Sequence, residues 1–349
     1  MKSDSNKKKT VKPTSEQIKE ASSKIAGYFG GYFAIWTLDL GIRTGLFEEI
    51  TNFLNGVTSS DLAKKKGFDP LYVDVWCRNA YGAELLEIQN GHYTLSPAMA
   101  TLLLDRDNPA YATGTAAVLI GLRDAFAALR ERIKSGERLW WNTAPREFVD
   151  AVAESSRAFY TRLLNFIDQR PELAQLLVTG TLVEVGSGYG TGLIRFAERF
   201  PKAKLVGVDG DSHSLKQAEF IFKQAKFDKQ VRFVESTFED YNESEVADIA
   251  LINISLHEAR NKKKATAAMY NALMPGGVIL VSEFPYPEKP EELRTLPARV
   301  MSGIQYFEAM INDQLLPTKE FINLLSEVGF KDIETVELTP VHTIILGHK

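Results

Sequence analysis

The stretch VEVGSGYGTG, residues 183–192, decides the fold of this chain. It follows the apolar run TLVEV and precedes the amphipathic run LIRFAERF, and its glycines are Gly186, Gly188, Gly190 and Gly192. A glycine-rich turn between a strand and a helix lets a ligand lie directly against the backbone. The spacing departs from the nicotinamide fingerprint G-x-G-x-x-G, because Thr191 or Leu193 stands where the third glycine would be. The pattern therefore argues against an oxidoreductase that binds NAD.

Beyond this loop, short apolar runs alternate with helical segments. The expected strands are residues 181–185, 204–209, 231–236, 247–254 and 277–284. Runs that are apolar throughout and joined by crossover helices are typical of a doubly wound parallel sheet, so the sequence predicts a Rossmann-like α/β fold. Two further runs, residues 331–339 and 342–349, are separated only by Pro340 and Val341. This connection is too short for a crossover and predicts an antiparallel terminal strand.

On the N-terminal side of the loop, residues 20–105 follow the order helix, turn, helix and hairpin, with the hairpin turn at Asn90-Gly91. This order predicts a mostly helical winged-helix domain. Its candidate recognition helix carries more acidic than basic side chains and would repel phosphates. The charged residues in question are Asp74, Arg78, Glu84 and Glu87. The domain is therefore expected to dimerise rather than to bind nucleic acid.

The remaining segments and the composition complete the expected organisation. Residues 106–175 are expected to form connecting helices, and residues 176–349 the sheet domain. Residues 1–19 are polar and basic, lack the apolar core of a signal sequence, and are expected to form a disordered tail. The chain has 349 residues, a net charge of -4 and one cysteine, Cys77. Since no apolar stretch approaches the roughly 20 residues of a membrane span, the sequence predicts a soluble, cytoplasmic protein without membrane association.

Polar residues at the ends of the expected strands indicate the ligand. Asp209 ends the second strand, where a carboxylate accepts both ribose hydroxyls, and Glu184 precedes the glycine loop, where it suits an ammonium group. The other expected cofactor contacts are Gly186, Gly188, Gly190, Gly210, Ser236, Thr237, Phe238 and Asn253. Carboxylates matched to a ribose and an amino acid, without a phosphate cradle, point to S-adenosylmethionine. The five histidines have no metal-site spacing, so no metal is expected.

These motifs resemble those of class I S-adenosylmethionine-dependent methyltransferases. VEVGSGYGTG is similar to their cofactor loop, and NISLHEARNKKKATAAMYNALMPGGVILVSEF, residues 253–284, is similar to the segment that carries a catalytic histidine. More specifically, the chain resembles the small-molecule O-methyltransferases that have an N-terminal winged-helix dimerisation domain, the caffeate and hydroxyindole type. The resemblance covers nearly the whole chain after residue 20 and implies a small-molecule methyl acceptor, a methyltransferase domain over residues 176–349 and a homodimer.

The resemblance also implies roles for individual residues. His257 falls on the general base that removes a hydroxyl proton during methyl transfer, and imidazole titrates near neutrality. Glu283 falls on the glutamate that orients this histidine, and Glu258 stands where the family usually has aspartate. The family has a second glutamate beside the histidine, and Leu315 aligns with it here. The expected acceptor contacts are Trp141, Tyr160, Gln305, Tyr306 and Glu308.

The leucine at position 315 keeps other functions open. Methyl transfer to the sulfur of a small thioether acid, of the methylthio-hydroxybutyrate type, needs no base because sulfur attacks directly. A third alternative is a non-catalytic winged-helix regulator that senses the cofactor, although it would need a basic recognition helix.

Overall fold

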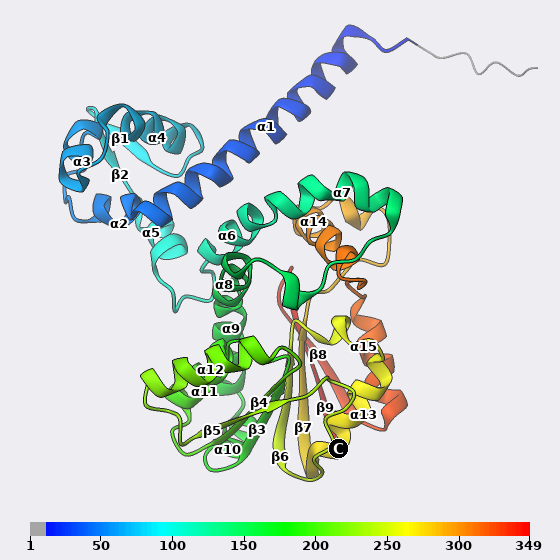
Figure 1. Cartoon of the computed structure of the whole chain (residues 1–349). Coiled ribbons are helices and arrows are strands. Elements are labelled where there is room, and N and C mark those ends of the chain that lie inside the picture. Colours follow the sequence, from blue (N-terminus) through cyan, green and yellow to red (C-terminus); the bar gives the residue numbers. More distant parts are fainter. Residues whose placement is uncertain (1–11) are drawn as a thin grey trace, which may run out of the picture. The chain divides into compact units, whose positions relative to one another are not determined.

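The computed structural model describes residues 12–349, which form two compact units that divide between Ala100 and Thr101 (Figure 1). The first unit consists of α1 (Ser15–Thr44), α2 (Leu46–Thr51), α3 (Ser59–Lys66), α4 (Pro70–Gly82), β1 (Glu87–Gln89) and β2 (His92–Thr94). The two strands pair antiparallel, and the positive φ angles of Asn90 (51°) and Gly91 (78°) form the predicted two-residue turn. Helix, helix and hairpin thus follow in the order expected of a winged helix.

The predicted disordered tail over residues 1–19 is wrong for residues 15–19, which belong to the start of α1. A capping box explains why the helix begins here: the Thr14 side chain accepts a hydrogen bond from the Gln17 N–H, and the Gln17 side chain accepts one from the Thr14 N–H. Residues 1–11 lie outside the described part of the chain. Within residues 12–349, no helix combines the length and hydrophobicity that a membrane crossing requires.

The second unit begins with helices that precede the sheet. The chain enters it within α5 (Pro97–Leu104), so the division falls inside this helix rather than at the predicted residue 105. The helices that follow are α6 (Thr113–Gly121), α7 (Arg123–Ser135), the 3-10 helix η1 (Trp141–Thr143), α8 (Arg146–Ser155), α9 (Arg157–Asp168) and α10 (Pro171–Leu176). They correspond to the connecting helices expected over residues 106–175, and they share one compact unit with the sheet.

A seven-stranded sheet forms the centre of the second unit (Figure 1). Its strands are β3 (Thr181–Val185), β4 (Lys204–Asp209), β5 (Val231–Glu235), β6 (Ala247–Asn253), β7 (Leu273–Glu283), β8 (Lys331–Thr339) and β9 (His342–His348), in the order β5-β4-β3-β6-β7-β9-β8. Strands β3 to β7 pair parallel, and β9 runs antiparallel to both β7 and β8. The predicted doubly wound sheet with an antiparallel terminal strand is confirmed.

The strand order reverses between β3 and β6. From β3 the chain proceeds outward to β4 and β5 on one side, and then returns to β6 and β7 on the other side. In open α/β sheets, ligands bind at the carboxyl ends of the strands at such a switch point. The glycine loop follows β3 directly, so the topology brings it to this position.

Helices cover both faces of the sheet because successive strand residues point to opposite faces. Leu182 lies in one buried cluster with side chains of α9, α10, α11 (Thr191–Arg199) and α12 (Ser212–Gln224). Its neighbour Val183 lies in the other cluster with side chains of α13 (Lys262–Ala272) and α15 (Thr318–Val328). One helix, α14 (Leu296–Met310), packs differently: its Phe307 and Met310 join Leu122 and Phe148 in a separate apolar cluster.

Candidate active site

A cavity of about 640 Å³ lies at the carboxyl ends of the parallel strands. Its wall combines the strand ends with side chains of α6, α8, α9 and α14. The predicted site residues that line it are Trp141, Tyr160, Gly186, Gly188, Asp209, Gly210, Ser236, Thr237, Phe238, Asn253, His257, Glu258 and Glu308. Residues from both the expected cofactor group and the expected acceptor group therefore share one cavity.

The glycine loop needs glycine for two different reasons. Gly186 has a φ of 73°, and a Cβ there would lie 2.6 Å from the Ser255 hydroxyl, so no other residue fits without strain. Gly188 has a φ of 51° and open space around it, and its N–H donates to Asp209 Oδ2 at 2.8 Å. Gly190 caps α11 and approaches Phe222, so it supports the loop without lining the cavity.

Asp209 is positioned to hold a diol. Its Oδ1 accepts from the Asp211 N–H and its Oδ2 from the Gly188 N–H, both at 2.8 Å. Burial raises the pKa of the Asp209 carboxyl group, although these backbone hydrogen bonds lower it. Each oxygen keeps a further lone pair, and the residue lines the cavity, so the carboxylate fits the vicinal hydroxyls of a ribose.

Glu184 lies behind the cavity wall rather than on it. It is completely buried, and Tyr160, predicted as an acceptor contact, donates its hydroxyl to Glu184 Oε1 at 2.6 Å. The other oxygen, Oε2, has no hydrogen-bond partner among the described residues. Burial raises the pKa of Glu184 to about 8, although the Tyr160 hydrogen bond lowers it. A buried carboxylate oxygen without a partner fits the ammonium end of S-adenosylmethionine.

Asn253 connects the cavity to a buried chain of hydrogen bonds. Ser282 donates to Asn253 Oδ1 at 2.5 Å, and His342 Nε2 lies 2.7 Å from the same serine hydroxyl. Arg162 donates to His342 Nδ1 at 2.8 Å, so this imidazole carries its proton on Nε2. Burial and the Arg162 charge hold the pKa of His342 well below its ordinary value, which keeps it neutral. The chain fixes the orientation of the Asn253 amide at the end of β6.

The turn after β6 carries backbone strain. Ile254 is β-branched and has a φ of 52°, a conformation that such residues rarely adopt. Its N–H donates to the Ser282 carbonyl at 2.7 Å, which ties the turn to β7. Backbone strain of this kind persists where the surrounding structure holds the residue in place. Here the strained turn places the 3-10 helix η2 (Leu256–Glu258) at the cavity.

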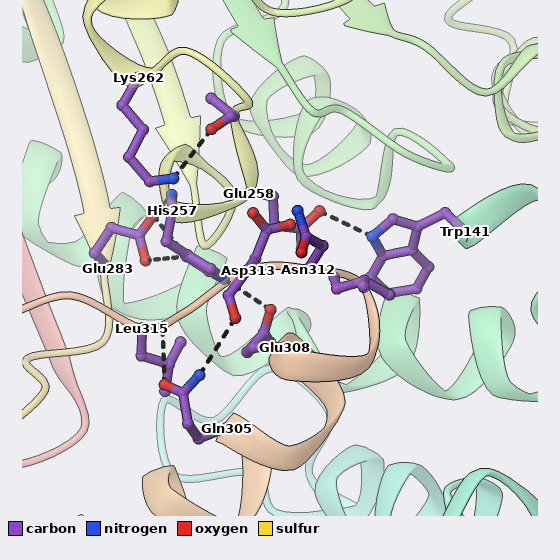
Figure 2. A network of polar contacts seen from close by, with 12 residues as sticks. Trp141, His257, Glu258, Lys262, Glu283, Gln305, Glu308, Asn312, Asp313 and Leu315 are labelled. Atoms are coloured by element: carbon purple, nitrogen blue, oxygen red, sulfur yellow. Dashed lines mark hydrogen bonds and ion pairs between the residues drawn. The ribbon is translucent and has the colours of Figure 1, made fainter. Parts of the chain in front are cut away.

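His257 lies between two glutamates at the cavity wall (Figure 2). Its Nδ1 lies 2.8 Å from Glu283 Oε2, and the Glu283 carboxylate also accepts the backbone N–H of His257. Its Nε2 lies 3.5 Å from Glu308 Oε2. Burial alone would lower the pKa of His257, but the two carboxylates outweigh it and raise the pKa well above its ordinary value. The imidazole is therefore oriented, and its protonated form is favoured.

A second glutamate does lie beside His257, and it is Glu308 rather than a residue at position 315. Leu315 is buried in an apolar cluster with Ala298 and Met301. Glu308 reaches the histidine from α14, which lies upstream of the loop that carries Leu315. The resemblance pointed to position 315, before α15, whereas here the earlier helix α14 supplies the carboxylate.

Two predicted acceptor contacts lie outside the cavity wall. Gln305 bridges the backbone after α14, since its amide accepts from the Leu315 N–H and donates to the Asp313 carbonyl. Tyr306 is 55% exposed and packs edge to face on Phe126. The two side chains adjoin Phe307 in sequence, and the burial of Phe307 turns them away from the cavity.

Glu258 faces the cavity and is held by Trp141, another predicted acceptor contact (Figure 2). Trp141 Nε1 donates to Glu258 Oε2 at 2.8 Å. Burial and the nearby Glu308 charge raise the pKa of Glu258 to about 8, while the His257 charge lowers it. The indole thus fixes a carboxylate that would otherwise be free to rotate into the cavity.

Sequence reasoning missed the aromatic wall of the acceptor end. Phe148, Phe159, Phe284 and Phe307 all line the cavity. The amphipathic pattern of α8 and α9 carries a signal for two of them, but it does not distinguish a cavity face from a core face. The wall forms only where α8, α9 and α14 converge.

Comparisons with known proteins agree with this geometry. Residues 179–328 match the model of a methyltransferase domain. A ubiquinone/menaquinone biosynthesis C-methyltransferase of Syntrophotalea carbinolica is 25% identical over 197 residues, which cover 51% of this chain and 82% of that protein.

Two solved structures share the fold of nearly the whole chain. A putative O-methyltransferase of Nostoc punctiforme has a TM-score of 0.72 at 15% identity, covering 97% of this chain and 100% of that one. Human N-acetylserotonin methyltransferase in complex with S-adenosylmethionine has a TM-score of 0.68 at 18% identity, covering 94% and 97%. From the cavity, the matched domain and these likenesses together, the chain is an S-adenosylmethionine-dependent methyltransferase with the fold of the O-methyltransferases.

Proposed function

We propose that this enzyme transfers a methyl group to a hydroxyl oxygen of a small molecule, with His257 as the general base. The position of His257 carries the proposal, because the residue lines the cavity, Glu283 holds its Nδ1, and its Nε2 has no hydrogen-bond partner among the described residues. S-adenosylmethionine supplies an electrophilic methyl group bound to a sulfonium. Methyl transfer is an in-line displacement, so the alignment of donor and acceptor supplies much of the rate.

The residues around the glycine loop hold the two ends of the cofactor in this proposal. Asp209 binds the ribose hydroxyls, and the open face of Gly188 lets the nucleoside approach the backbone. Glu184 lies behind the cavity wall and balances the positive charge of the ammonium group. The Tyr160 hydroxyl holds the Glu184 carboxylate in place. Ser236, Thr237 and Phe238 line the cavity beyond β5, where they border the adenine.

The acceptor side provides the proton chemistry. When bound, S-adenosylmethionine would supply the methyl group to the acceptor oxygen, and its sulfur would keep the electron pair of the broken carbon–sulfur bond. The hydroxyl proton moves to His257 Nε2, and Glu283 stabilises the resulting imidazolium through Nδ1. The raised pKa of His257 makes it a strong base, but the imidazole must first be neutral.

The charges around the cavity favour a hydroxyl acceptor over a thioether acid. A carboxylate on the acceptor would need a cation, and Arg260 is the only lysine or arginine among the described residues that line the cavity. Its guanidinium is held by Asp313 at 2.9 Å and lies 4.8 Å from the Trp140 ring centroid. The aromatic wall and the oriented base suit an aromatic or other apolar alcohol.

We further infer that the chain forms a homodimer through its first unit and does not bind nucleic acid. Helix α1 has a large exposed apolar surface for its length, made by Ile18, Ile25, Tyr28, Phe29, Tyr32, Phe33 and Leu40. Exposed apolar surfaces of this extent mark interfaces. On α4, Arg78 pairs with Asp74 at 2.7 Å, so this arginine is engaged within its own helix. Light scattering on the full chain, with Phe29→Ser and Phe33→Ser together, would test the dimer, which these substitutions should dissociate.

Product analysis tests the proposed reaction. The enzyme is incubated with methyl-labelled S-adenosylmethionine and a panel of phenols, catechols and aliphatic alcohols. Products are identified by mass spectrometry and NMR. A label found on oxygen supports the proposal. A label found only on sulfur when thioether acids are added, with every hydroxyl compound unmodified, would replace it with the thioether reaction.

A further inference from the structure

The acceptor end of the cavity carries a surplus of acidic side chains over basic ones. Glu258 and Glu308 both line the cavity, and together with His257 they offer three side-chain atoms within 4.8 Å of one another. The imidazolium between them is already bound on its other nitrogen by Glu283, at 2.8 Å. Three glutamates thus lie around a single imidazole, as Figure 2 shows for Glu258, Glu283 and Glu308.

The neighbouring cations do not remove this surplus. Arg260 forms its ion pair with Asp313, a fourth carboxylate behind the cluster. Lys262 donates to the Ala259 carbonyl at 3.0 Å. Each of these cations thus has its own partner away from Glu258.

The carboxylates themselves are short of partners. Glu308 is 5% exposed, and its Oε2 makes no hydrogen bond with the described residues, since His257 Nε2 stands at 3.5 Å. For Glu258, Trp141 Nε1 is a neutral donor, at 2.8 Å from Oε2. Carboxylates in a largely enclosed site with so little positive charge are costly to ionise, and they bind a cation readily.

We propose that Glu258 and Glu308 form a subsite for a protonated amine, and that the methyl acceptor is an aromatic hydroxyl compound that carries this amine. The inference rests on the proposed function and names its substrate class. Trp141 stacks on Phe148 and meets Phe307 edge to face, so an aromatic wall stands beside the two carboxylates. Aromatic faces attract organic cations, and the carboxylates accept their N–H groups.

A divalent metal suits the same cluster less well. Magnesium and calcium require about six or more oxygen ligands, and the cluster offers two carboxylates and one imidazole. A metal on His257 Nε2 would also block the atom that takes the proton. An ammonium group does not require six ligands, because it donates hydrogen bonds to the carboxylates. It also leaves Nε2 of His257 unoccupied.

An ammonium group in this subsite also prepares the base. In the free enzyme, Glu308 and Glu283 both stabilise the proton on His257. A cation that engages Glu308 weakens one of these interactions, so the imidazolium releases its proton more easily. The acceptor that carries the amine therefore helps generate the neutral base that its own hydroxyl group needs.

Binding of matched acceptors tests the subsite. Phenol, catechol and 5-hydroxyindole are each used as the 2-aminoethyl, propyl and carboxymethyl derivative, which differ chiefly in the charge of the side arm. Isothermal titration is run with the wild-type enzyme saturated with S-adenosylhomocysteine. The aminoethyl compound of at least one skeleton should bind at least about tenfold more tightly than its propyl partner, and the carboxymethyl compound should bind most weakly.

Variants show whether the preference arises at Glu258. Glu258→Gln keeps the shape and the acceptor oxygen for Trp141, and it should reduce the preference for the amine to about twofold or less. The matched control is Glu327→Gln, which removes the same charge from an exposed pair with Lys263 on α15 and should keep the full preference. Circular dichroism and binding of S-adenosylhomocysteine verify that each variant is folded.

The outcomes separate this inference from the proposed function. Equal binding of the three derivatives, or binding of none of the amines, overturns the subsite. If propyl compounds are nevertheless methylated on oxygen, the proposed function stands without it. Micromolar binding of Mg²⁺ or Mn²⁺ alone, lost in Glu258→Gln, together with no preference for amines, would make the cluster a metal site instead.

Discussion

The hydroxyl of Tyr160 lies 2.6 Å from Glu184 Oε1, and this contact joins helix α9 to strand β3 beneath the glycine loop. Both residues are buried, and the tyrosine ring also occupies the space that a Cβ at Gly192 would need. The helices before the sheet are thereby part of the cavity wall, and one of them completes the hydrogen bonding of a strand residue.

Tyr160→Phe should destabilise the protein. The substitution leaves Glu184 Oε1 buried without its donor, and an unsatisfied buried group costs about 1–3 kcal/mol. Urea unfolding measures the loss. Tyr306→Phe is the matched control, because that side chain is 55% exposed and should change the free energy of unfolding by less than about 0.5 kcal/mol. Equal effects of the two substitutions would contradict the role of the Tyr160 hydroxyl.

Glu184 should make stability depend on pH. Burial raises its folded-state pKa from 4.5 to about 8, so its contribution is full below the unfolded pKa and is lost as pH rises through the folded pKa. The free energy of unfolding of the ligand-free enzyme should therefore fall between about pH 4.5 and pH 8. In Glu184→Gln this fall should be smaller. Unfolding curves at intervals across this range compare the two proteins, and parallel curves would contradict the prediction.

His257→Ala should lower kcat by about 10²- to 10⁴-fold, the range for loss of a general base. Binding of S-adenosylhomocysteine should be unchanged, because the imidazole faces the acceptor side of the cavity. Steady-state kinetics with an active acceptor and isothermal titration provide the two measurements. His92→Ala, in the hairpin of the first unit, is the control. Near-normal turnover in His257→Ala would indicate an acceptor that needs no base.

Glu308→Gln should move the pH profile of kcat/KM, which reports the pKa of His257 in the free enzyme. The Glu308 carboxylate raises the pKa of His257, so removing its charge lowers that pKa. Activity that depends on neutral imidazole should then rise at a lower pH than in the wild type. Leu315→Met, in the apolar cluster with Met301, should leave the profile in place. A profile that stays in place in Glu308→Gln would contradict the influence of this carboxylate on His257.

Gly186→Ala should disrupt the cofactor loop. Its positive φ costs an ordinary residue about 1–2 kcal/mol, and the new Cβ would also meet the Ser255 hydroxyl at 2.6 Å. Both the melting temperature and the affinity for S-adenosylhomocysteine should fall. Gly303→Ala is the comparison, because this glycine lies in α14 with open space and should gain about 0.5–1 kcal/mol in stability. If Gly186→Ala binds the cofactor normally, the loop is not constrained as described.

The sheet and half of the site could be predicted from the sequence because their signals are local. Strand periodicity located β3 to β9, and the connection of Pro340 and Val341 was short enough to require an antiparallel pair. Asp209 and His257 follow strand ends, and parallel strands present their carboxyl ends at one edge. The resemblance added Glu283, which the structure confirms as the partner of His257 Nδ1.

Only the tertiary structure decided which side chains face the acceptor. Gln305, Tyr306 and Glu308 lie within one turn of α14, and the sequence offered all three as contacts. The burial of Phe307 and Met310 against Leu122 and Phe148 sets the rotation of that helix, which turns Glu308 toward His257 and leaves Tyr306 outside. Such a rotation depends on packing between segments far apart in the chain, and no local pattern encodes it.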